Sequence, residues 1–214
     1  MNDYQHPNLD RNLMGVQNAM EYNVAGEPAL RVIGNNFGWG IHLADGNIEG
    51  VSHIEKFGMN IDVDSDKETI WDGGGIYTYL STGETLSVTS SSVNDSVSGS
   101  GARIVEIQGC NDAGEVILET VEIGSESTQL FKRVFRAKVL TSGASGVNEG
   151  IIDITSVASA TVVAQIGVDG TGSHAAGRGQ TFMALYTIPA GKTGYITQWT
   201  VGCGKQNTDA VATL

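Results

Sequence analysis

Short runs of alternating hydrophobic and polar residues fill the chain from Thr69 onward. The runs are rich in β-branched and aromatic residues and are bounded by Gly, Ser, Asn and Asp, which is typical of strands that bury one face. Nine strands are predicted, over residues 76–80, 85–90, 102–109, 115–123, 129–140, 150–157, 161–167, 181–188 and 193–201. With no long helical pattern after residue 60, they predict an all-β fold with a β-sandwich or jelly-roll-like body.

Two turn sequences between predicted strands support this fold. The sequence Asn-Asp-Ala-Gly at 111–114 predicts a hairpin, because Gly114 is free to take a positive φ. At 189–192, Pro-Ala-Gly-Lys combines a proline that fixes φ with a glycine that permits a tight reversal. Ser- and Gly-rich stretches also fall between predicted strands, where they are typical of loops at the ends of a sandwich. They cover residues 90–101, 142–146 and 167–179.

The first 60 residues have a different pattern, Asn-rich at the start and then interrupted by glycines. Apolar spacing predicts one short helix near residues 13–22. Phe37, Trp39 and Ile41 alternate with two glycines, so the three large side chains would share one face of an extended chain. This face indicates either an arm that lies on a partner or a strand of the protein's own core.

The chain is therefore expected to have two parts. Residues 1–60 form an extended, mostly irregular N-terminal arm, and residues 61–214 form the β-sandwich domain. The strand-like run at 209–214 indicates either that Leu214 closes a sheet edge or that the natural sequence continues beyond it.

Composition and charge narrow the function. The chain has 29 Gly but only 3 Pro, which favours many tight turns over a proline-rich linker. Its net charge of −12 makes nucleic acid a poor partner, since a phosphate backbone needs a basic surface. No apolar run approaches the roughly 18 residues that span a membrane, and the N-terminus lacks the pattern of a signal peptide. Cys110 and Cys203 lie outside any CxxC motif, so no zinc site is indicated.

No motif assembles a catalytic site, so the protein is not expected to be an enzyme or to need a cofactor. The HExxH, GxSxG and GxxxxGK[ST] patterns are all absent. The best metal candidate is the acidic run Asp62, Asp64 and Asp66, because carboxylates at alternate positions open a calcium loop. Lys67 and Gly73 occupy the positions of the required turn glycine and bidentate glutamate, so a solvated acidic loop is favoured.

A cluster of cations stands out within this acidic chain. Lys132, Arg136 and Lys138 share one face of the predicted strand with Val134. The opposite face is predicted to carry Phe131, Arg133, Phe135, Ala137 and Val139. The cations indicate either a docking face for a carboxylate-rich neighbour or a solvated outer face of the sheet, and the second is the more general use.

Five segments together resemble uncharacterised structural proteins of tailed, especially marine, bacteriophages. The resemblance covers about residues 50–205 and implies a virion location without enzymatic activity, but it carries no functional residues. The segments are Ile-Trp-Asp-Gly-Gly at 70–74, Ala-Arg-Ile-Val-Glu-Ile-Gln-Gly at 102–109, Glu-Thr-Val-Glu-Ile at 119–123, Phe-Lys-Arg-Val-Phe-Arg-Ala-Lys-Val-Leu at 131–140 and Tyr-Thr-Ile-Pro-Ala-Gly-Lys-Thr-Gly at 186–194.

We therefore expect a virion structural protein, assembled in the host cytoplasm, that decorates and cements the capsid head. Its partners would be the major capsid protein or neighbouring copies, with a homo-oligomer, preferably a trimer. The expected contacts are Phe37, Trp39 and Ile41 on the arm and Lys132, Arg136 and Lys138 on the body. One alternative is a tail or tail-fibre component that binds the host surface. Another is a carbohydrate-binding β module, in which exposed Trp71, Tyr77 and Tyr79 would stack on sugar rings.

Overall fold

The computed structural model describes residues 20–22, 28–30, 43, 48, 50–61, 63, 66–169 and 176–202. The chain divides into two compact units, Met1–Glu55 and Lys56–Leu214, so residues 56–60 of the expected arm fall in the second unit. In the first unit, β1 (Met20–Tyr22) pairs antiparallel with β2 (Pro28–Leu30). The helix expected near residues 13–22 is therefore wrong at its C-terminal end, and the rest of it lies outside the described residues.

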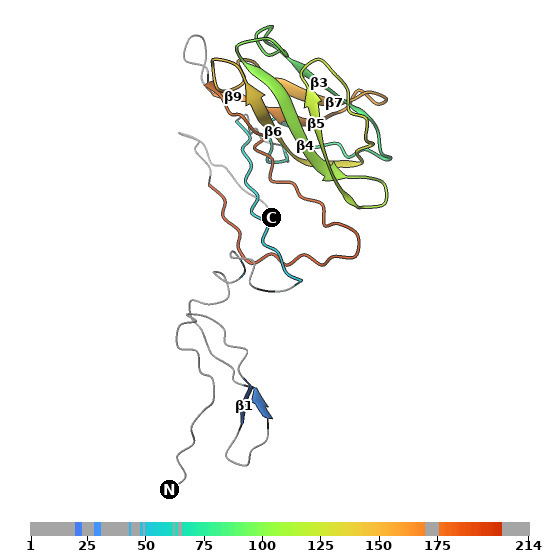
Figure 1. The fold of residues 1–214 in the computed structure, drawn as a ribbon, viewed down its shortest axis with the longest axis vertical. Coiled ribbons are helices and arrows are strands. Elements are labelled where there is room, and N and C mark those ends of the chain that lie inside the picture. The colour runs from blue at the N-terminus through green and yellow to red at the C-terminus, as the bar shows by residue number, and fades with distance from the viewer. Residues whose placement is uncertain are drawn as a thin grey trace. The chain divides into compact units, whose positions relative to one another are not determined.

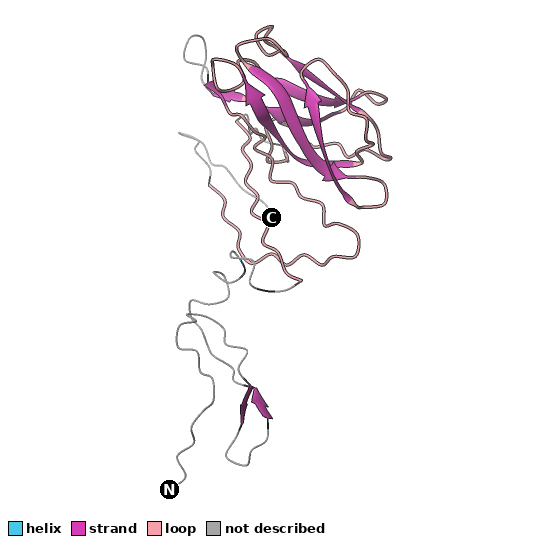
Figure 2. Ribbon diagram, in the orientation of Figure 1, coloured by secondary structure: helices cyan, strands magenta, loops and turns pink. Residues whose placement is uncertain are grey.

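The second unit is built on two antiparallel three-stranded sheets (Figures 1 and 2), which confirms the all-β prediction. One sheet has the order β3-β7-β8 and the other the order β5-β4-β6. A further pair of short strands, β9 (Val168–Asp169) and β10 (Ala176–Gly177), is also antiparallel. The six longer strands are β3 (Leu86–Ser90), β4 (Ala102–Cys110), β5 (Val116–Glu122), β6 (Arg133–Ser142), β7 (Ile152–Ser156) and β8 (Val162–Ile166).

Six of the nine expected strands form, and three do not. Residues 76–80, 181–188 and 193–201 are extended or irregular, although their sequences alternate like those of the other six. Alternation shows which residues suit a strand, but a strand also needs a free edge to pair with. Tyr77 and Leu80 are nevertheless buried in the core, and so is Met183. These side chains fill the core from segments that add no strand to either sheet.

The hairpin predicted at 111–114 is confirmed between β4 and β5. Gly114 has a φ of +75°, and its N–H donates to the carbonyl of Asn111 at 3.1 Å. The side chain of Asn111 accepts the N–H of Glu115 at 3.0 Å, which closes the turn from the other side. The turn at 189–192 also forms, with Gly191 at a φ of +73°, but the segments on either side of it do not pair with each other.

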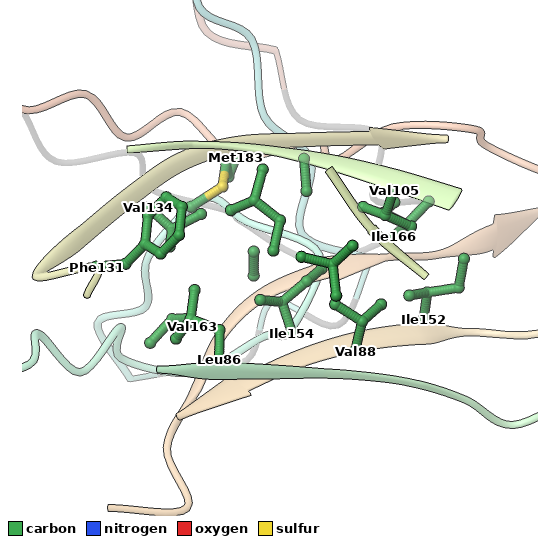
Figure 3. Packing of buried hydrophobic residues seen from close by; sticks show 14 of the residues in the cluster. Leu86, Val88, Val105, Phe131, Val134, Ile152, Ile154, Val163, Ile166 and Met183 are labelled. Carbon is green, nitrogen blue, oxygen red and sulfur yellow. The ribbon is translucent and has the colours of Figure 1, made fainter. Parts of the chain in front are cut away.

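One hydrophobic cluster lies between the two sheets, and both sheets contribute side chains to it (Figure 3). In β7 the burial alternates strictly, so that Ile152 and Ile154 enter the cluster while Asp153 does not. The alternating pattern of the sequence is thus the direct cause of the two-layer body. The labelled members in Figure 3 are Leu86, Val88, Val105, Phe131, Val134, Ile152, Ile154, Val163, Ile166 and Met183.

The chain crosses from one sheet to the other directly after β5. Gly124 takes a φ of +87°, and residues 124–127 then lie along the outer edge of β3. The N–H of Gly124 donates to Val88 at 2.8 Å, and the N–H of Ser127 donates to Leu86 at 2.7 Å. This crossover attaches the β5 end of one sheet to the free edge of the other.

A buried aspartate joins three loops at one end of the body. The side chain of Asp95, in a residue that is 3% exposed, accepts the N–H groups of Ala102 and Glu149 at 2.7 and 2.9 Å. Its second oxygen accepts the N–H of Gly150 at 2.8 Å and the hydroxyl of Ser90 at 2.6 Å. The carboxylate therefore connects the end of β3, the start of β4 and the approach to β7.

We predict that Asp95→Ala lowers the free energy of unfolding by about 3 kcal/mol, because three N–H groups, those of Ala102 and Gly150 buried, lose their acceptor. Urea unfolding of the full chain measures the effect, with the slope expected to stay unchanged. Glu122→Ala removes the same charge from an exposed position of β5 and is the matched control. An Asp95→Ala protein as stable as this control would contradict the role given to the carboxylate.

Candidate interaction surfaces

The cationic strand β6 contains a bulge that alters its two faces. The pairing of β4 with β6 shifts register between Gln108 and Gly109, so that Phe135 is the extra residue on β6. Val134 and Ala137 both enter the core, whereas Phe135 packs against the ring of Tyr186 at 4.9 Å. A bulge reverses the alternation beyond it. The expectation that Val134 shares the cationic face, with Phe135 opposite, is therefore wrong.

The three expected docking cations all have partners within the protein. Lys132 Nζ lies 3.2 Å from Asp112 Oδ1, and Lys138 Nζ lies 3.0 Å from Glu106 Oε1. Arg136 Nη2 donates to the amide oxygen of Gln180 at 2.9 Å. Hydrogen bonds from Gln108 and then Lys138 hold the pKa of Glu106 below its usual value. Two of the three charges are thus neutralised, and only Arg136 has an uncharged partner.

Lys56 adds a second cation beside Arg136. Its ammonium group donates to the carbonyl of Phe135 on the bulge of β6. Burial, and then the charge of Arg136, lower the pKa of Lys56 to about 8. The remaining positive charge of the face therefore lies at Lys56 and Arg136. Sequence reasoning missed Lys56, because its contact with β6 spans 79 residues of chain and no local pattern records it.

The lowered pKa of Lys56 predicts a rise in stability above pH 8. The folded-state pKa lies below the ordinary value of 10.5, so the unfolded chain binds more protons between pH 8 and 10.5. Stability should rise across this window by about 1 kcal/mol, since solvent screens a partly exposed group.

Urea unfolding at pH 7.5 and 10.5 should show that Lys56→Met loses this rise, whereas Lys192→Met, at an exposed position, retains it. Comparison with the second variant removes the contribution of the other groups that titrate in the same range. Equal pH dependence in the two variants would contradict the assignment.

The acidic run offers little support for a calcium site. Asp62 and Asp64 lie outside the described residues, and Asp66 is exposed. Asp72, the last carboxylate of the run, is buried and forms an ion pair with Arg178, which also contacts Asp169 at 2.8 Å. Among the residues that the structure describes, no three His, Cys, Asp or Glu side chains are grouped to hold a metal ion.

Two of the three aromatics proposed for sugar stacking belong to the core. Trp71 and Tyr77 are 6% and 7% exposed and meet edge to face at 5.0 Å. The hydroxyl of Tyr77 donates to the carbonyl of Val163 at 2.9 Å, which anchors it against β8. Tyr79 alone is exposed, and the guanidinium of Arg133 lies over its ring at 5.0 Å. The expectation of an exposed platform at Trp71 and Tyr77 is therefore wrong.

An exposed apolar segment extends from the body after the turn at 189–192. All ten residues of 193–202 are exposed, and in Figure 1 the red end of the trace lies apart from the two sheets. Tyr195 and Ile196 are 84% and 83% exposed, and Trp199 and Val201 are about half exposed. The pattern of the sequence predicts a strand here, but the structure supplies no partner for it within the part of the chain that it describes.

Phe37, Trp39 and Ile41 lie outside the described residues, so their expected contacts stay predictions. In the described part of the chain, no helix is long and apolar enough to cross a membrane. The chain matches no family model, no curated protein and no solved structure.

Proposed function

We propose that the protein is a bacteriophage virion component, most specifically a decoration or cement protein that stabilises the capsid head. Its partners would be the major capsid protein and neighbouring copies of the same chain. The observation that carries this proposal is the contrast between a body whose polar groups are satisfied internally and an apolar extension that is not covered. Such a chain completes its structure in an assembly.

The body has the character of a rigid scaffold. Among the described residues, no buried side-chain nitrogen or oxygen lacks a hydrogen-bond partner. Asn148, fully buried, donates to the carbonyls of Gly150 and Gly167 at 2.7 and 3.1 Å and accepts the N–H of Gly179 at 3.0 Å. A buried amide that bonds three backbone groups holds the loops in place, and this suits a structural role.

The extension supports assembly on energetic grounds. Residues 193–202 carry two large aromatic side chains and two branched aliphatic ones into water, where each loses the free energy of burial. Contiguous exposed apolar surface is typical of protein interfaces. A partner that covers the segment recovers that free energy, and a virion supplies many copies of the same partner.

The finer architecture is part of the same proposal. The two sheets with one core between them suit a β-sandwich, in which six strands are present. A jelly roll has about eight strands. Residues 181–188 and 193–201, which the sequence predicts as strands, would supply the two that are missing once they are paired in the assembly.

A tail or tail-fibre component and a carbohydrate-binding module remain the alternatives. The burial of Trp71 and Tyr77 counts against the carbohydrate reading, since it leaves Tyr79 alone among the three proposed aromatics for stacking. Binding to tails or to host cells, with no binding to capsids, would favour the tail reading.

The arm is tested by sedimentation of the purified full chain with empty capsids of the phage that encodes it. We predict that Phe37→Ser, Trp39→Ser and Ile41→Ser together weaken capsid binding at least about tenfold, or about 1.4 kcal/mol. Ile76→Ser with Val93→Ser, which removes two exposed apolar side chains from the body, should leave binding unchanged. Equal binding by the two variants would remove the arm from the proposal.

The cationic face is tested in the same assay. Lys132→Gln, Arg136→Gln and Lys138→Gln together should weaken capsid binding and reduce its dependence on salt, if these cations dock against carboxylates. Lys192→Gln, at an exposed position, is the control. Because Asp112 and Glu106 already neutralise two of the cations, we expect Arg136 to account for most of the effect. An unchanged salt dependence would assign the face to solvent.

A further inference from the structure

Three of the four outer edges of the two sheets are covered by the chain itself. Residues 179–181 bind the edge of β6, where the N–H of Val139 donates to Gly179 at 2.7 Å. Residues 124–127 bind the edge of β3. At the edge of β8, the carbonyl of Val163 accepts the hydroxyl of Tyr77, and none of the five residues of β8 is exposed. An edge covered in this way cannot accept a further strand.

The fourth edge, that of β5, carries no strand in the described part of the chain. At its centre the side chain of Gln129 donates to the carbonyl of Leu118 at 2.9 Å, and the N–H groups of Thr128 and Gln129 donate to the carboxylate of Glu119 at 2.7 and 2.9 Å. Among the described residues, only the Gln129 side chain occupies a backbone group at the centre of the edge, and an added strand would replace that one bond.

Every second residue of an edge strand points its N–H and C=O groups away from the sheet. Leu118 is one of these residues, so Val116 and Thr120, two positions away on either side, point their backbone groups outward too. Val116 and Leu118 are 58% and 51% exposed, so the first half of this edge also presents two apolar side chains on its outer face.

Residues 193–202 have the properties of a strand that lacks an edge. Their sequence, Thr-Gly-Tyr-Ile-Thr-Gln-Trp-Thr-Val-Gly, contains no charge and is rich in β-branched and aromatic residues. The structure gives none of them a hydrogen bond to the described part of the chain. Ten residues are enough to span the seven of β5. Each copy of the protein thus carries one open edge and one unpaired strand sequence.

The segment is badly placed to pair with β5 of its own copy. The N–H of Ala190 donates to the carbonyl of Gly114 at 2.8 Å, so the segment starts beside the end of the hairpin from which β5 also starts. Pairing within one copy would therefore be parallel, whereas every strand pair of the body is antiparallel. The far end of β5 is about 23 Å away, and the three Cα–Cα steps from Ala190 to Thr193 span at most about 11 Å.

We propose that residues 193–202 add as an antiparallel strand to β5 of a second copy of the chain. This inference rests on the part of the proposed function in which copies assemble with one another, and it names their contact. Main-chain hydrogen bonds along β5 supply the affinity, and the apolar side chains Val116 and Leu118 meet Tyr195 and Trp199. Head-to-tail pairing of this kind forms a ring, such as the expected trimer, when the rotation from one copy to the next closes.

The absence of charge in the segment suits a contact between copies. The copies are strongly acidic, and an uncharged segment approaches another copy without adding to their repulsion.

Two complementary variants of the full chain test the contact by size-exclusion chromatography with light scattering. Trp199→Lys damages the added strand, and Leu118→Lys damages the open edge. Each is expected to weaken self-association at least about tenfold. Val93→Lys, which places the same charge on a loop residue that is 92% exposed, should associate like the wild type. Thermal melting checks that all three variants fold.

Mixing the two damaged proteins gives the sharper result. The Leu118→Lys protein retains its strand and the Trp199→Lys protein retains its edge, so the mixture should form one-to-one dimers that neither protein forms alone. A wild-type protein that stays monomeric, variants that associate as well as the wild type, or a mixture without dimers would each overturn the inference.

Photo-crosslinking from benzoylphenylalanine at position 195 identifies the contact directly, with one copy labelled by ¹⁵N. The expected product joins position 195 of one copy to residues 118–122 of another. Crosslinks confined to one copy, or to another surface, would contradict it. The capsid assay separates this inference from the proposed function: crosslinked oligomers that ignore capsids refute the function alone, and monomers that bind capsids refute the inference alone.

Discussion

Neither three-stranded sheet of this protein could be stable by itself, because each has an apolar face that must be kept from water. The two faces bury each other around one cluster, and Leu86, Ile107 and Ile154 in it are fully buried. Every other feature depends on holding the two layers together. The crossover after β5 joins their edges, and Phe131 and Met183 fill the space between them from outside the regular strands.

Buried polar side chains hold the loops, whose arrangement the apolar core does not determine. Apolar packing does not specify how long loops are arranged, so the carboxylate of Asp95 and the amide of Asn148 hold the loop ends by bonding their backbone groups. The ion pair of Asp72 with Arg178 does the same for the segment that follows β10. These acidic and amide side chains are structural here, and Asp72, at the end of the acidic run, is one of them.

The same closure of the body decides which surfaces are left for partners. The chain covers three outer edges of its sheets and pairs two of the three expected docking cations, Lys132 and Lys138, with carboxylates. These edges and cations therefore offer less to a partner than the sequence indicates. What remains is the open edge of β5, the Lys56 and Arg136 pair, and the apolar segment 193–202. A virion protein that assembles through strand addition would use the first and the last of these together.

Local sequence was sufficient for the all-β class, for six strands and for the hairpin at 111–114, because alternation and turn chemistry act within a few residues. It could not place Phe135, since a bulge on β6 reverses the pattern, nor Lys56, whose partner is distant in the chain. It also marked 181–188 and 193–201 as strands. Only the tertiary structure decided that neither segment forms a strand: residues 181–188 make isolated hydrogen bonds, such as those to Ala137 and Ile70, and residues 193–201 have no hydrogen-bond partner in the described part of the chain. A strand needs an open edge, and the folded body covers most of its own.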